Sequence, residues 1–238
     1  MTRAIVVVPT YNEVENLPIL VPAILEQDPR LEVLVVDDGS PDGTGELADK
    51  LASDEGRVHV LHRESKQGLG PAYRAGLARA LELGADYVIQ MDADFSHPPS
   101  SLPELLEEIQ SHDVVLGSRY LNGITVVNWP IERILISWFG NVYARRISGL
   151  PISDTTGGFR CMRRDLLEKM GFERIRSNGY AFQIEMNYRF VKQGARIKEV
   201  PFFFVDRTRG TSKLNFRIGL EALWVVWWLR IADALGRL

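Results

Sequence analysis

The segment Tyr87-Val88-Ile89-Gln90-Met91-Asp92-Ala93-Asp94 joins a short apolar run directly to two aspartates that one residue separates. Such a run, followed by turn-forming residues such as Ser96-His97-Pro98-Pro99, is typical of a buried β-strand. Side chains at positions i and i+2 of an extended segment point the same way, so Asp92 and Asp94 can face one divalent cation that also binds substrate phosphates. A solvated turn is the ordinary alternative for an isolated Asp-x-Asp triplet. The segment predicts a strand that ends in a metal site for diphosphate chemistry.

Two further apolar runs end in polar loops, and both lie upstream. Residues 4–8 lead into Pro9-Thr10-Tyr11-Asn12-Glu13, and residues 32–36 lead into Asp37-Asp38-Gly39-Ser40. Each run is typical of a buried strand. In an open parallel sheet the ligand crevice lies beyond the carboxyl ends of the strands, so we expect the three loops to meet there.

Helix and strand patterns alternate through the first half of the chain, as expected for βαβ units. The predicted helices span residues 16–26, 44–53, 71–83 and 101–111, and further strands span residues 58–61 and 114–117. The expected fold is α/β, with a mostly parallel sheet flanked by helices.

Composition supports an ordinary globular enzyme. The chain has 238 residues, of which 45% are hydrophobic and 25% charged, and its net charge of −3 argues against a nucleic-acid binder. Cys161 is the only cysteine, and four histidines without a cluster offer no zinc site. The N-terminal apolar run stops at Pro9 and does not resemble a signal peptide, so we expect the protein on the cytoplasmic side of a membrane, as a peripheral protein.

Gly68-Leu69-Gly70 begins like a dinucleotide-binding fingerprint, but its third glycine would have to stand at position 73, which is Tyr73. Hydride transfer is therefore not expected. The glycines fit a turn and helix N-terminus that pack near the nucleotide, with Lys66 as a candidate neighbour of the phosphate or base.

Taken together, the motifs resemble the nucleotide-sugar signatures of inverting family 2 glycosyltransferases and, more narrowly, the dolichol-phosphate (polyprenol-phosphate) mannose synthases. Besides the three loops above, the resemblance extends over almost the whole chain through the following segments: Gly117-Ser118-Arg119-Tyr120, Ser153-Asp154-Thr155-Thr156-Gly157-Gly158-Phe159-Arg160, Gly179-Tyr180-Ala181-Phe182-Gln183-Ile184-Glu185-Met186 and Val205-Asp206-Arg207 to Lys213. It implies a GT-A type, Rossmann-like fold that binds GDP-mannose and Mg²⁺ or Mn²⁺.

The resemblance also implies roles for single residues on the donor side. The residues expected around the guanosine and ribose are Pro9, Tyr11, Glu13, Val36 and Asp38. Those expected at the diphosphate and metal are Asp92, Ala93, Asp94 and Ser96, with Asp92, Asp94 and Ser96 as metal ligands. Ser96 stands where the family commonly has glutamine, and a hydroxyl can still bind metal directly or through water. Arg207 and Lys213 fit a loop that closes over the donor diphosphate.

The expected acceptor is a polyprenyl or dolichyl phosphate. Its phosphate is already anionic, with a second pKa near ~6, so it needs positioning rather than a strong general base. Guanidinium groups grip phosphate oxygens with parallel hydrogen bonds. By resemblance, Arg119, Arg133 and Ser137 match the acceptor-phosphate positions, and the last two lie one helical turn apart. The expected catalytic residues are Asp92, Asp94, Arg119 and Arg207, and the product would be a β-linked mannosyl phosphoryl polyprenol.

Two tryptophan-bearing segments suggest how the chain meets a lipid. Residues 129–147 fit an interfacial helix and also a helix packed on the sheet, and the amphipathic pattern alone favours packing on the sheet. Residues 222–229 are apolar throughout but much shorter than the ~20 residues that span a bilayer. We expect a catalytic domain over residues 1–213 and a C-terminal helix over residues 214–238 that contacts a membrane surface, a membrane-embedded partner subunit or a second copy.

Other interpretations stay open at this point. A family 2 enzyme could use UDP-glucose or another donor with a polysaccharide or protein hydroxyl as acceptor, which would require a general base. A non-catalytic nucleotide-sugar-binding subunit would bind GDP without turnover; the acidic triplet and basic loop argue against it.

Overall fold

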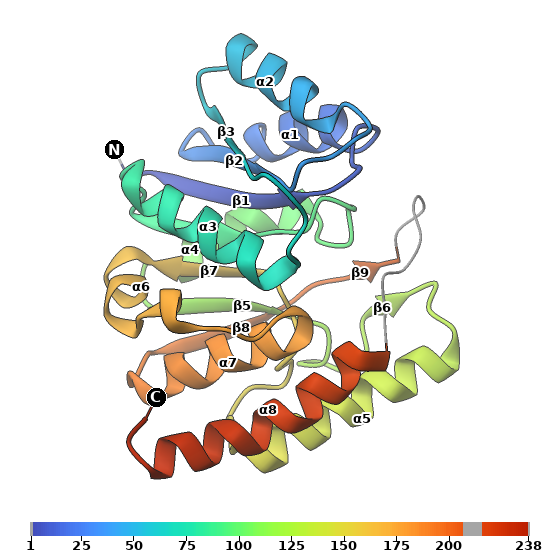
Figure 1. The fold of residues 1–238 in the computed structure, drawn as a ribbon, viewed down its shortest axis with the longest axis vertical. Coiled ribbons are helices and arrows are strands. Elements are labelled where there is room, and N and C mark those ends of the chain that lie inside the picture. Colours follow the sequence, from blue (N-terminus) through green and yellow to red (C-terminus); the bar gives the residue numbers. More distant parts are fainter. Residues whose placement is uncertain (1, 207–215, 238) are drawn as a thin grey trace.

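The computed structural model describes residues 2–206 and 216–237, which form helices on both sides of a central sheet (Figure 1). The sheet has seven strands in the order β3-β2-β1-β4-β7-β5-β8. Their bounds are β1 (Ala4–Thr10), β2 (Leu31–Asp37), β3 (Val58–His62), β4 (Tyr87–Gln90), β5 (Val114–Ser118), β7 (Arg160–Arg163) and β8 (Ile197–Pro201). Only β7 runs antiparallel to its neighbours, which confirms the predicted mixed, mostly parallel sheet.

The strands are apolar on both faces because helices cover both faces. One core cluster joins Ile5 and Val7 of β1 to α3 (Leu69–Glu82), α6 (Arg164–Met170) and α7 (Gly179–Lys192). The other joins Ala4, Val6 and Val8 of β1 to α1 (Leu17–Leu25), α2 (Thr44–Asp54) and α4 (Leu102–Glu108). Successive side chains of a strand point to opposite faces, so one continuous apolar run supplies both clusters.

The elements predicted for the first half are confirmed, with shifts of a few residues at their ends. The largest shift is in α4, which is preceded by a short 3₁₀ helix (Pro99–Ser101) and ends three residues earlier than expected. The sequence pattern does not predict β7. This strand carries Arg160, which is fully buried, and a charged residue in a four-residue run conceals a central strand.

The two tryptophan-bearing segments form α5 (Ile131–Ser148) and α8 (Phe216–Ala234), which lie against each other beneath α7 in Figure 1. Trp227 of α8 donates a hydrogen bond from Nε1 to the Tyr143 hydroxyl of α5, at 2.8 Å. Of the two alternatives for residues 129–147, packing on the sheet is the one that the amphipathic pattern favours; in the structure α5 buries only Asn141, Ala144 and Ser148 and packs mainly on α8.

The C-terminal helix is not a detached appendage. Val225, Val226 and Leu229 of α8 are buried in the core cluster that contains α7. Among residues 2–206 and 216–237, no helix has both the length and the hydrophobicity that crossing a bilayer requires. A separate two-stranded ribbon pairs β6 (Val126–Val127), which precedes α5 in the chain, with β9 (Phe204–Val205).

Candidate active site

A pocket of about 550 Å³ lies at the carboxyl ends of the central strands, where the three polar loops were expected to meet. It is lined by Pro9, Thr10, Tyr11, Glu13, Asp38, Lys66, Gly68, Leu69, Ala72, Asp92, Ala93, Asp94, Arg133, Thr156, Gly158, Asn178, Gly179, Tyr180, Gln183 and Glu221. The loops after β1, β2 and β4 meet there because these three strands are parallel neighbours.

Asp92 is held by contacts on both its side chain and its backbone. The Tyr73 hydroxyl donates to Asp92 Oδ1 at 2.7 Å, and the Asp92 backbone N–H donates to Nδ1 of His97 at 3.0 Å. Burial raises the pKa of Tyr73 well above its usual value and lowers the pKa of His97, so the phenol stays protonated and the imidazole neutral. These states match the donor and acceptor roles of the two side chains.

The loop turns sharply after Asp94. Phe95 has a φ of +62°, an uncommon conformation for a residue with a side chain, and the turn brings the Ser96 N–H to 3.1 Å from Asp94 Oδ1. Backbone strain of this kind concentrates at functional sites.

The donor set fits a divalent cation that is bound together with a diphosphate. Asp92 and Asp94 supply carboxylate oxygens, and the Ser96 hydroxyl is buried with no hydrogen-bond partner among the described residues. Across those residues, no cluster of three or more histidine, cysteine or acidic side chains could hold a metal. Hard cations take oxygen ligands, and Mg²⁺ in particular binds through one or two carboxylates plus substrate phosphates.

Most of the residues expected to surround the nucleotide lie together in the pocket. Pro9, Tyr11, Glu13 and Asp38 line the pocket, and Lys66 lies over the Tyr11 ring, 4.1 Å from its centroid. Burial raises the pKa of Asp38, against the opposing charge and hydrogen bond of Arg63. Arg63 is a contact that the sequence analysis missed.

Val36 differs from its expected place, because its side chain is fully buried in the core cluster that contains Val7 and α3. The backbone carbonyl oxygen of Val36 accepts a hydrogen bond from the Thr10 hydroxyl at 3.4 Å. Val36 is accordingly not among the residues that line the pocket.

The three expected acceptor-phosphate residues lie in different surroundings. Arg119 is buried, and its guanidinium binds Asp154 in a two-pronged ion pair with distances of 2.6 and 2.7 Å. Burial favours the neutral carboxyl, but Arg119 outweighs it and holds the pKa of Asp154 below its usual value. Arg119 does not line the pocket itself; it reaches Thr156, which does, through a 2.9 Å hydrogen bond.

Arg133 lines the pocket directly. Its guanidinium stacks on Trp129 at 4.0 Å from the ring centroid and donates to Asp206 at 2.7 Å. The Arg119 guanidinium lies 5.9 Å from the same ring centroid, so both arginines converge on Trp129. Ser137, one turn along α5 from Arg133, accepts a 2.8 Å hydrogen bond from the Tyr120 hydroxyl.

The sequence analysis assigned no role to the part of the pocket built by β7 and the start of α7. Gly158, Asn178, Tyr180 and Gln183 line it, and all four stand in or beside the quoted motif segments. Gly68 and Gly70 allow the start of α3 to approach Asn178, whose side chain accepts a 2.9 Å hydrogen bond from the Gly70 N–H. This confirms a packing role for these glycines. Arg207 and Lys213, expected to cover the diphosphate, lie outside the described residues.

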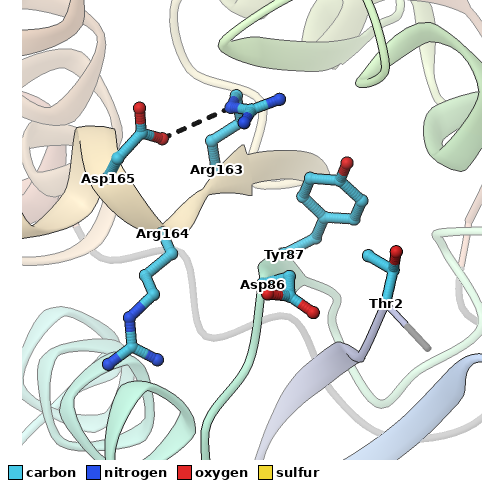
Figure 2. Close-up of a pocket in the computed structure, with 6 residues that line it drawn as sticks. All are labelled: Thr2, Asp86, Tyr87, Arg163, Arg164 and Asp165. Atoms are coloured by element: carbon cyan, nitrogen blue, oxygen red, sulfur yellow. Dashed lines mark hydrogen bonds and ion pairs between the residues drawn. The ribbon is translucent and has the colours of Figure 1, made fainter.

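A second hollow of about 610 Å³ lies at the opposite edge of the sheet, where β1 and β4 begin (Figure 2). Thr2, Asp86, Tyr87, Arg163, Arg164 and Asp165 line it. Arg163 pairs with Asp165 at 3.3 Å, and Arg164 donates to the backbone oxygens of Leu81 and Ala85. Its arginines bind neighbouring protein groups, and none of the expected site residues lies there.

The chain is similar to known proteins over most of its length. The chain is 47% identical over 221 residues to an undecaprenyl-phosphate mannosyltransferase of Micrococcus luteus, covering 93% of this chain and 91% of that protein. It is 46% identical over 232 residues to a polyprenol monophosphomannose synthase of Mycolicibacterium smegmatis, covering 96% and 88%.

Among solved structures, glucosyl-3-phosphoglycerate synthase from Mycobacterium tuberculosis, in complex with Mn²⁺, UDP and glucosyl-3-phosphoglycerate, shares the fold. The TM-score is 0.68 at 22% identity, covering 99% of this chain and 80% of that one. The sequence profile described as Glycosyl transferase family 2 matches residues 5–171. The chain therefore belongs to glycosyl transferase family 2.

Proposed function

We propose that this protein transfers mannose from GDP-mannose to a polyprenyl or dolichyl phosphate, with a divalent metal ion and with inversion at the anomeric carbon. The observation that carries the proposal is the order of polar groups along the edge of the sheet. Asp38 follows β2, Pro9 and Thr10 end β1 and lead into Tyr11 to Glu13, and Asp92 to Asp94 follow β4. Thr156 and Gly158 precede β7, and Arg119 follows β5.

This order matches the parts of the two substrates. In space the strands run β2-β1-β4-β7-β5, and neighbouring strands lie about 4.8 Å apart. A nucleoside over β2 and β1 would place its diphosphate at the aspartates beyond β4. The sugar would then lie beyond β7, between the diphosphate and the arginines that converge on Trp129. The names of the two bacterial relatives support mannose as the sugar and a polyprenyl phosphate as the acceptor.

The residues of the chain have distinct parts in this transfer. Asp92 and Asp94, with Ser96 beside them, would hold Mg²⁺ or Mn²⁺. When bound, that ion neutralises charge on the departing diphosphate. Tyr73 fixes one oxygen of Asp92, and Lys66 adds positive charge on the nucleotide side of the pocket. Arg207 and Lys213 stay proposed as further diphosphate contacts.

The acceptor side needs charge and orientation rather than a base, because a phosphate monoester is already ionised near neutral pH. Arg133 reaches the pocket, and Ser137 lies one turn away on the same helix. Arg119 acts on this region through Thr156, whose hydroxyl it contacts. An anionic oxygen held here would attack the anomeric carbon from the side opposite the leaving diphosphate.

A lipid acceptor also requires contact with a membrane, and α5 and α8 supply an exposed apolar surface. We call this surface the α5–α8 face; its members are Ile131, Leu135, Ile136, Trp138, Phe139, Leu223, Trp224, Trp227, Trp228 and Ile231, each at least 40% exposed. Large contiguous exposed apolar patches mark interaction sites. Arg133 stands on α5 among them, which would bring the acceptor phosphate to the pocket from a membrane surface. The cytoplasmic side stays a prediction.

The experiment is transfer of labelled mannose from GDP-mannose to a short polyprenyl phosphate, with and without Mn²⁺, for the wild type and Asp94→Ala. We expect a lipid-extractable product that depends on the metal and falls at least about 100-fold in the variant. Asp49→Ala, on exposed α2, is the matched control and keeps activity. GDP binding without any lipid product would overturn the proposed acceptor. Transfer from UDP-glucose in place of GDP-mannose would overturn the proposed donor.

A further inference from the structure

Arg160 is a fully buried arginine at the start of the central strand β7, and it contacts Gln183, which lines the pocket. Its Nη2 donates to the backbone oxygen of Gly157 and to Oε1 of Gln183, each at 2.6 Å. Its Nε and Nη1 have no hydrogen-bond partner among the described residues. An arginine is costly to bury without full hydrogen bonding, so a role beyond holding the sheet is indicated.

The contact with Arg160 determines the orientation of the Gln183 side chain. A guanidinium can only donate hydrogen bonds, so the Gln183 atom that faces it must be the carbonyl oxygen. The amide NH₂ group then points the other way, towards Gly158, where an added Cβ would lie 3.0 Å from Nε2. Gln183 and Gly158 both line the pocket. The missing side chain at Gly158 leaves the amide open to a ligand.

The position of the Gln183 amide relative to the strands indicates which part of the donor it contacts. Gly158 precedes β7, which lies between β4, with its metal-binding aspartates, and β5, with Arg119. In the arrangement proposed above, this interval holds the transferred sugar. Hexose hydroxyls and diphosphate oxygens can both accept a hydrogen bond from an amide NH₂ group, so the position of Gln183 and Gly158 between β4 and β5 is what favours the sugar.

We propose that Gln183 donates a hydrogen bond from Nε2 to a hydroxyl of the transferred sugar and that Arg160 is the positioning residue that orients its amide. This inference rests on the proposed function. Gln183 would bind the sugar of the donor and not its nucleotide. The buried guanidinium of Arg160 would keep the Gln183 amide from flipping.

The test compares the affinities for GDP and GDP-mannose, measured by calorimetry with Mn²⁺ for the wild type, Gln183→Leu and Gln183→Glu. We expect Gln183→Leu to weaken GDP-mannose binding about three- to tenfold, as for one lost hydrogen bond, and to leave GDP binding unchanged. Gln183→Glu keeps the contact with Arg160 and can accept from a hydroxyl, so its loss should be smaller. Gln193→Leu, at the exposed position directly after α7, is the matched control.

Arg160→Lys tests the positioning role. A single ammonium group lacks the planar fork that reaches Gly157 and Gln183 together. We expect Arg160→Lys to weaken the binding of GDP-mannose but not of GDP. In the Gln183→Leu background, Arg160→Lys should cause no further loss of GDP-mannose affinity. Thermal unfolding checks that each variant is folded, and Gln183→Glu keeps the test valid if Arg160→Lys does not fold.

Four results would overturn the inference. Unchanged GDP-mannose binding by Gln183→Leu would remove the sugar contact. Equal weakening of GDP and GDP-mannose, or a larger loss in Gln183→Glu than in Gln183→Leu, would indicate a contact with the diphosphate. An additional loss from Arg160→Lys in the Gln183→Leu background would remove the positioning role. Failure of the wild type to bind GDP-mannose would instead count against the proposed function.

Discussion

Asp92 is held by Tyr73, from a separate helix, and by His97, from the turn that follows it. Its side chain receives a hydrogen bond from Tyr73 of α3, and its backbone donates to His97, which stacks on Phe159 at 5.0 Å. Carboxylates that bind metals are commonly oriented by such partners, and loss of one typically lowers metal affinity 10- to 100-fold. The position of one oxygen of Asp92 therefore depends on a helix that the acidic triplet itself does not reveal.

Replacing Tyr73 with phenylalanine removes that hydrogen bond and keeps the ring stacked on Phe182. We expect Mn²⁺ binding in the presence of GDP, followed by electron paramagnetic resonance, to weaken about tenfold. Tyr188→Phe, which removes a hydroxyl bound to Asp233 away from the pocket, is the control. Equal Mn²⁺ affinity in the wild type and Tyr73→Phe would show that the hydroxyl does not orient the ligand.

The approach of α3 to the sheet depends on glycine. A Cβ on Gly76 would lie 2.3 Å from Val7 Cγ1 and 2.9 Å from Val36 Cγ2, closer than packed atoms allow. The helix thus presses directly on β1 and β2, and this brings Tyr73 to Asp92 and the loop before α3 to the pocket.

We expect Gly76→Ala to lower the free energy of unfolding by about 1–3 kcal/mol, as overpacking of a core does. Gly140→Ala on α5 is the matched control, because no atom lies within 4 Å of its added Cβ. That change should raise stability by up to about 1 kcal/mol through helix propensity. Urea unfolding measures both, and a stabilising Gly76→Ala would show that α3 shifts away without cost.

The start of β5 and the start of β8 are joined by Asp113 and Arg196, at 2.8 Å. The Arg196 hydrogen bonds hold the pKa of Asp113 at about 2, below its usual value near 3.9. A carboxyl group whose pKa is lowered by folding stabilises the protein at pH values above its pKa in the unfolded chain. This stabilisation is lost as the pH falls from about 4 to about 2.

Between pH 4 and pH 2, the free energy of unfolding should therefore fall less steeply in Asp113→Asn than in the wild type. Urea unfolding at a series of pH values measures the slope. Asp165→Asn, on the exposed start of α6, is the control. An unchanged slope in Asp113→Asn would mean that the pair is already open in acid.

At the scale of the whole molecule, α5 connects the pocket to the α5–α8 face, because Arg133 lines the pocket and stands on the same helix as exposed apolar residues of that face. Trp224 is 67% exposed and Trp227 49% exposed, while Val225, Val226 and Leu229 of the same helix are buried. The apolar residues of α8 therefore serve two surfaces, one in the core and one open to solvent.

Replacing Trp224 and Trp227 with serine should reduce binding to phospholipid vesicles at least about tenfold, because tryptophan favours the membrane interface. Loss of the hydrogen bond from Trp227 to Tyr143 should cost little stability at this exposed position. Vesicle sedimentation and thermal unfolding measure the two effects. Ile19→Ser, at an exposed apolar position on α1, is the control. Undiminished vesicle binding by the double variant would rule out this face as the membrane contact.

The sequence alone determined the strands β1, β2 and β4, their polar loops and the convergence of those loops. Apolar runs that end in polar turns are local, and parallel strands must bring their carboxyl ends to one edge. The resemblance carried by the ordered motifs correctly indicated the family. It did not reveal that Arg119 is committed to Asp154 or that the Val36 side chain lies in the core.

Tertiary structure alone decided the partners of groups distant in the chain. The insertion of β7 between β4 and β5 placed Arg160 against Gln183, and the approach of α3 placed Tyr73 on Asp92. The packing of α5 on α8 decided which apolar side chains face solvent. The hydrophobic pattern of a sequence shows that a helix has an apolar side. It does not show which neighbour covers that side, because the choice of neighbour depends on contacts between residues far apart in the chain.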